Sequence, residues 1–88
     1  MHELTLLNDL LKKVREIAVQ EKAKKVKSVS IWLGAMSHIS ASHFKEHFDL
    51  ATKDSDLEGV PLNIETSDDA FHPQAQDILL RSVDVESQ

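Results

Sequence analysis

The 88-residue chain has no cysteine and no tyrosine, and only two glycines and two prolines. Without cysteine it cannot form disulfide bridges, thiolate zinc sites or a cysteine nucleophile, and this composition agrees with a reducing compartment. The two glycines, Gly34 and Gly59, are too few for a glycine-rich phosphate-binding loop. No apolar run is long enough to cross a bilayer, so we expect no association with a membrane.

Positive charge is also scarce, because 10 Lys and Arg residues stand against 15 Asp and Glu residues and leave a net charge of −5. Nucleic-acid binding needs a basic surface, so we expect no nucleic-acid partner. The first residues do not read as a signal peptide, and we expect a cytoplasmic protein. Hydrophobic residues make up 41% of the chain, enough for one modest core, which predicts a single domain over residues 1–88.

Two segments have the apolar spacing of amphipathic helices, residues 3–21 and a segment that starts at a Ser40 or Ser42 cap and reaches about Thr52. The expected core stripe of the first is Leu4, Leu7, Leu10, Leu11, Val14, Ile17 and Ala18. That of the second is Ala41, Phe44, Phe48 and Ala51. The basic run Lys22, Lys24, Lys25 and Lys27 is interpreted as a solvated exit turn of the first helix, with an acidic partner surface as the alternative.

Apolar and polar residues alternate in three segments, which is typical of strands: residues 26–33, 60–64 and 78–85. Polar connections lie at residues 53–59 and 67–76. Pro61 indicates an edge position or a strand start. Trp32 is expected on the face opposite Ile31 and Leu33, where it packs under a helix or forms a contact surface. The strand–helix–strand unit favours a parallel crossover, and the short last connection allows an antiparallel neighbour. The sequence therefore predicts an α+β fold with two helices packed on a small three-stranded mixed sheet.

The first candidate metal site is the N-terminal sequence Met1-His2-Glu3. The α-amine, the backbone nitrogens of residues 2 and 3 and the imidazole of His2 can place four nitrogen donors in a plane, which suits Ni(II) or Cu(II). The bulk of His2 favours retention of Met1, which would supply the amine. From the residues alone, the alternative is a frayed terminus in which Glu3 favours the helix dipole.

The second candidate is a group of histidines, of which His43 and His47 are four residues apart and share a face of the predicted helix. Such a pair can chelate a divalent metal, although solvated surface histidines are the commoner case. His38 lies shortly before this helix, and His72 lies in a polar connection with no partner at useful spacing.

No signature of an enzyme is present, since the chain lacks a nucleophile elbow and the acidic pair Asp68-Asp69 is interpreted as solubilising charge. The helix pair also lacks the glutamate of a zinc-protease motif, because Phe44 follows His43. A metal-dependent enzyme built on His43 and His47 is therefore the least favoured of the function hypotheses.

Taken in order, several short segments resemble the HypA/HybF family of hydrogenase maturation proteins. The chain opens with Met-His-Glu and a helix, and a strand then ends in Gly-Ala-x-Ser within VSIWLGAMSHIS. The segments HFDLAT, DLEGVPLNIE and ILLRSVDVE follow in the order of the family's second helix, next strand and last strand. The family inserts a zinc ribbon with two CxxC pairs before the last strand, whereas SDDAFHPQAQ stands at that place here.

The resemblance implies a nickel-binding accessory protein, with Ni(II) held at Met1, His2 and Glu3. Because the chain has no cysteine and lacks the family's ribbon, we expect no zinc. The resemblance implies two kinds of partner, the hydrogenase large subunit or another nickel enzyme such as urease, and a nickel-handling GTPase. Some members place an acidic residue near the nickel after Gly-Ala-x-Ser, where this chain has Ser40. The candidate auxiliary ligands are His38, His43 and His47. The alternative function is a metal-free HypA-like docking or interaction module in a hydrogenase-type complex.

Overall fold

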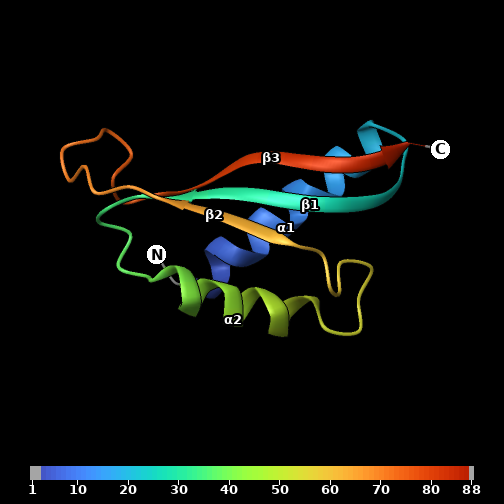
Figure 1. Cartoon of the computed structure of the whole chain (residues 1–88), viewed down its shortest axis with the longest axis horizontal. Coiled ribbons are helices and arrows are strands. Elements are labelled where there is room, and N and C mark those ends of the chain that lie inside the picture. The colour runs from blue at the N-terminus through green and yellow to red at the C-terminus, as the bar shows by residue number, and fades with distance from the viewer. Residues whose placement is uncertain (1–2, 88) are drawn as a thin grey trace.

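The computed structural model describes residues 3–87, and for Glu3 and Leu4 it describes the backbone alone. The elements follow in the order α1 (Glu3–Gln20), β1 (Ala23–Leu33), α2 (Ala41–Thr52), β2 (Leu62–Thr66) and β3 (Ile78–Ser87). Both helices pack against one face of a three-stranded sheet (Figure 1). The predicted α+β class, with two helices on a small mixed sheet, is confirmed. Neither helix of the described chain has the length and apolar character needed to cross a lipid bilayer.

Strand β1 occupies the centre of the sheet, in the order β2-β1-β3. It pairs in parallel with β2, as the strand–helix–strand unit predicts. It pairs antiparallel with β3, so β3 lies beside β1 and not beside β2, to which the last connection joins it. Ile31 therefore lies between Ile64 and Leu80. Neighbouring residues of a strand point to opposite faces, so this register brings apolar side chains of all three strands to the face that the helices cover.

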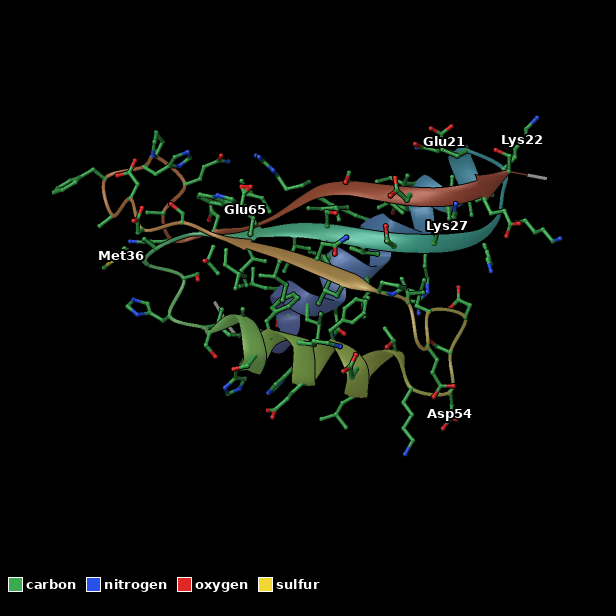
Figure 2. All side chains as sticks on the ribbon, viewed as in Figure 1. Glu21, Lys22, Lys27, Met36, Asp54 and Glu65 are labelled. Carbon is green, nitrogen blue, oxygen red and sulfur yellow. The ribbon has the colours of Figure 1, made fainter. Side chains whose placement is uncertain are left out.

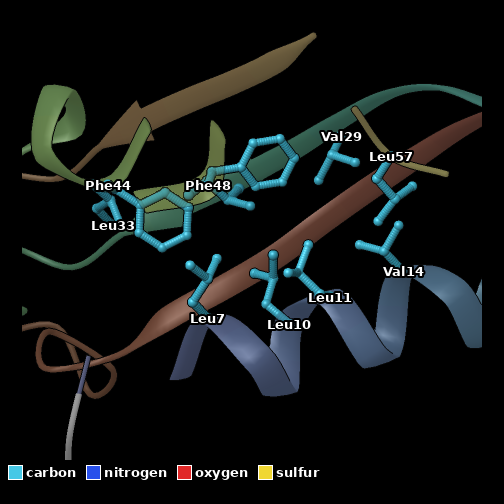
Figure 3. Packing of buried hydrophobic residues seen from close by; sticks show 10 residues of the cluster. Leu7, Leu10, Leu11, Val14, Val29, Leu33, Phe44, Phe48 and Leu57 are labelled. Atoms are coloured by element: carbon cyan, nitrogen blue, oxygen red, sulfur yellow. The ribbon is translucent and has the colours of Figure 1, made fainter. Parts of the chain in front are cut away.

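The core lies between α1, α2 and this inner face of the sheet (Figure 3). Its buried members are Leu7, Leu10, Leu11, Val14, Val29, Ile31, Leu33, Phe44, Phe48 and Leu57. Leu57 comes from the loop that was expected to be polar, where Ser55 Oγ accepts from the backbone N–H of Leu57 at 3.1 Å and donates to the Thr52 carbonyl at 2.6 Å. These two hydrogen bonds shape the turn that carries Leu57 into the core.

The expected burial of Ala51 is wrong, because Ala51 is exposed and Thr52 is buried. Phe44, Phe48 and Thr52 follow one another at four-residue spacing, and this row faces the core. The Thr52 hydroxyl donates to the carbonyl of Phe48 at 2.8 Å, which satisfies its polar group inside the protein. Ile17 and Ala18 of α1 are only partly buried.

Four predicted strand boundaries need correction, including the end of β2, which lies at Thr66 rather than at residue 64. β1 starts at Ala23 rather than at residue 26, because Ala23 pairs with Ser87 at the far end of β3, which runs two residues further than predicted. The lysines after residue 22 are therefore strand residues and not an exit turn; the turn itself contains Glu21 and Lys22, beside the end of β3 (Figure 2). β2 begins at Leu62, after Pro61, whose carbonyl accepts the N–H of Val29.

The connection before β3 folds over the outer face of the sheet. Trp32 is only 8% exposed, and its indole lies 4.9 Å from the imidazole of His72, measured between ring centroids. The backbone N–H groups of Gly34 and Met36 donate to the carbonyls of Asp77 and Ala75, at 3.0 Å and 2.7 Å. The expected packing of Trp32 under a helix is thus wrong, because a loop covers it, and His72 of that loop contacts its ring.

Candidate metal site

The N-terminal candidate site falls mostly outside the described residues. Met1 and His2 are not described, and Glu3 is the first residue of α1. The assignment of a metal to Met1, His2 and Glu3 therefore stays a prediction.

The place where α1 begins is well defined by its packing. Leu7, one turn into the helix, is 1% exposed and lies in the same core cluster as Phe44 of α2 and Leu33 of β1. Figure 3 shows Leu7 facing these two residues, and Figure 1 shows the first turns of α1 beside the first turns of α2. The start of α1 and the histidine-bearing half of α2 thus belong to the same end of the molecule.

Helix α2 begins with a side-chain cap. Ser40 has extended backbone angles, φ −81° and ψ 158°, and its Oγ accepts a hydrogen bond from the N–H of His43 at 3.1 Å. This is the usual geometry of a serine N-cap and confirms Ser40 over Ser42. Ser40 follows the Gly-Ala-x-Ser segment, where some family members place an acidic residue near nickel, and here its hydroxyl serves the helix.

The histidine pair of α2 is close-packed. The Nε2 atoms of His43 and His47 are 3.0 Å apart, the ring centroids are 4.7 Å apart, and the ring planes are inclined by 24°. The prediction that the two side chains share a face of the helix is confirmed. His43 is exposed and His47 is partly buried, so both rings can be reached from solvent.

His38 does not join this pair in a larger ligand group. It is exposed and lies in the connection between β1 and α2 with a φ of 62°. Within the part of the chain that the structure describes, no three His, Cys, Asp or Glu residues come together in a way that could hold a metal ion. Of the candidate auxiliary ligands, the structure brings together only His43 and His47.

The sequence as a whole matches a family model described as hydrogenase/urease nickel incorporation, metallochaperone, hypA, over residues 1–73. The hydrogenase maturation factor HypA of Caldanaerobacter subterraneus subsp. tengcongensis is 34% identical over 62 residues, which cover 70% of this chain and 54% of that protein. The protein of the same name from Escherichia coli K12 is 35% identical over 65 residues, which cover 74% of this chain and 56% of the relative. The match thus spans little more than half the length of these relatives.

The fold has counterparts among solved structures. The solution structure of the Ni metallochaperone HypA from Helicobacter pylori superposes with a TM-score of 0.80 at 18% identity, over 100% of both chains. A second solution structure, of HypA protein, gives a TM-score of 0.70 at 19% identity, over 100% of this chain and 98% of the other. At such low identity these likenesses support the fold alone.

Proposed function

Since the chain belongs to the HypA family of hydrogenase and urease nickel-incorporation metallochaperones, we propose that it binds Ni(II) and carries it to a nickel enzyme such as [NiFe]-hydrogenase. The observation that carries the proposal is the family match over residues 1–73, which includes the N-terminal residues. The proposed partners are the hydrogenase large subunit, or another nickel enzyme, and a nickel-handling GTPase. The protein would act in the cytoplasm as a single domain over residues 1–88, as a carrier with no turnover of its own.

The proposed nickel ligands are the amine of Met1, the imidazole of His2 and the backbone nitrogens of His2 and Glu3. Only ions that prefer a planar arrangement gain enough from four nitrogen donors to displace amide protons, so Ni(II) and Cu(II) are favoured over Zn(II). Binding releases protons and therefore tightens as pH rises. A site at the start of a chain also leaves the ion open to a receiving protein.

We further propose that the domain folds without zinc. The chain has no cysteine, so it cannot build a thiolate zinc ribbon. Residues 67–77, which stand where the family carries that ribbon, are held in place by ordinary contacts, including the ring contact between His72 and Trp32 and the burial of Ala75 to 5% exposure. Apolar packing and backbone hydrogen bonds support this loop without a metal.

Calorimetric titration of untagged protein with Ni(II) tests the proposal, because an N-terminal tag would block the amine. We expect one tight Ni(II) per chain in a diamagnetic complex with a visible d–d band. His2→Ala and acetylation of the amine should each abolish this tight binding, whereas Glu3→Ala should weaken it less, because its proposed ligand is a backbone nitrogen. His38→Asn is the matched control, since it removes an exposed imidazole and asparagine tolerates the left-handed backbone found there.

Two results would contradict the proposal. A paramagnetic six-coordinate complex that survives the loss of His2 would show that the nickel ligands lie elsewhere. A failure of the intact protein to bind Ni(II) tightly would favour the metal-free docking module.

A further inference from the structure

We propose that His43 and His47 form a second metal site on α2, a two-histidine chelate for a divalent ion that takes ligands at right angles, such as Ni(II) or Cu(II). This proposal does not depend on nickel binding at Met1 and His2. It rests on the distance and orientation of the two imidazoles.

The distance between the two Nε2 atoms matches adjacent ligands of one ion. With metal–nitrogen bonds of about 2.1 Å, two ligands at 90° have their nitrogens about 3.0 Å apart, whereas a tetrahedral angle separates them by about 3.4 Å. The observed separation of His43 Nε2 and His47 Nε2 is 3.0 Å. Square-planar and octahedral ions use right-angle positions, so this separation is compatible with Ni(II) or Cu(II).

The two rings already lie next to each other before an ion arrives. Their Nε2 atoms, 3.0 Å apart, are closer than the ring centroids, 4.7 Å apart, so the nitrogen-bearing edges tip toward each other. Phe44 and Phe48, each directly after one of the histidines, are 1% exposed and fix the rotation of the helix about its axis. Because the helix is held in advance, little backbone freedom remains to be lost on binding.

Without an ion, the short Nε2–Nε2 contact is a hydrogen bond in which one neutral imidazole donates to the other. A neutral imidazole can carry its proton on either nitrogen. If both rings carry it on Nδ1, the two Nε2 lone pairs become available to one ion and neither ring needs to change its charge. The chelate therefore needs a different tautomer from the hydrogen bond and a rotation of the rings, because both lone pairs must then point at the ion.

The two histidines would fill two coordination positions of such an ion, and further ligands would fill the others. No third His, Cys, Asp or Glu joins the pair to form a metal-binding group among the described residues. The nearest cation along the helix, Lys45, is paired with Asp49 at 3.1 Å, so its charge is partly balanced locally. With two protein donors the site should bind more weakly than a four-nitrogen chelate and exchange its ion readily.

The test uses full-length untagged protein carrying His2→Ala, so that the N-terminal chelate is absent. Titration with Ni(II) should reveal one remaining site, and adding His43→Gln or His47→Gln should weaken it by about tenfold or more, because either change leaves a single imidazole. Glutamine keeps a polar side chain with good helix propensity, and circular dichroism verifies the fold of each variant. Leu50→Gln in the same background is the matched control, because it places glutamine at a position of α2 that is 73% exposed and carries no metal ligand, and it should leave binding unchanged.

Two outcomes would overturn the proposal. One is that Ni(II) and Cu(II) binding by the His2→Ala protein does not change when His43 or His47 is replaced. The other is that the intact protein binds a single ion which is lost on removal of His2 as well as on removal of either helix histidine, so that the pair belongs to one shared site with the N-terminus. Failure of the N-terminal site gives a different result, in which intact and His2→Ala proteins bind Ni(II) equally and binding still depends on the helix pair.

Discussion

Replacing Gly34 by alanine should detach the loop before β3 from the sheet. Gly34 directly follows β1, and its N–H donates to the carbonyl of Asp77 at 3.0 Å. A Cβ atom added at Gly34 would collide with the carbonyl group of Ala75 and lie 2.8 Å from the carbonyl oxygen of Gln74. These are backbone atoms, so no side-chain rotation can relieve the clash and the loop itself must move.

The expected loss of stability follows from the contact between two backbone segments, the end of β1 and the loop before β3, neither of which can rotate out of the way. Forcing an extra methyl into a packed site destabilises a protein by about 1–3 kcal/mol. In a domain of this size each 1 kcal/mol lowers the melting temperature by about 4–8 °C. Displacement of the loop should also move His72 away from Trp32, which is 8% exposed in the native fold.

Urea unfolding and tryptophan emission together check this prediction, because Trp32 is the single tryptophan of the chain. We expect a lower unfolding midpoint and a native-state emission shifted to the red. Gly59→Ala is the control, since Gly59 has a φ of +78° and no atom lies within 4 Å of its added Cβ. That change should cost about 1–2 kcal/mol through backbone strain and leave the emission unchanged. Native stability and emission in the Gly34→Ala protein would refute the described packing of the loop.

Three further perturbations test the core, the cap and the absence of structural zinc. Phe48→Ala should cost about 3–5 kcal/mol in urea unfolding because its ring is 1% exposed, while Leu50→Ala, at a residue 73% exposed, should have little effect; equal costs would show that the core is misplaced. Ser40→Ala should lower the free energy of unfolding by about 1 kcal/mol, because it removes the acceptor of the His43 N–H, and Ser42→Ala should lower it less. Thermal melts measure both losses, and a larger loss for Ser42→Ala would show that Ser40 is not the cap. Melts with and without a chelator should overlay, and a large loss of stability in chelator would reveal a structural metal.

Local patterns were enough to predict the helices and the fold class. The spacing of apolar residues in α1 predicts that one side of the helix is buried. Four residues of that side are buried as expected: Leu7, Leu10, Leu11 and Val14. The cap of α2 depends on Ser40 and the N–H three residues later, so it is a local feature as well. The i, i+4 spacing of His43 and His47 likewise placed both on one face. The family resemblance was readable from short segments in order, and the match over residues 1–73 confirms it.

The remaining features depend on contacts between segments distant in the chain, and only the tertiary structure decided them. β1 extends back to Ala23 because Ser87 offers it a hydrogen-bonded partner, which alternation along one segment cannot reveal. Trp32 of β1 is covered by the loop between β2 and β3, which lies far along the chain. Leu57 reaches the core from a segment of polar composition.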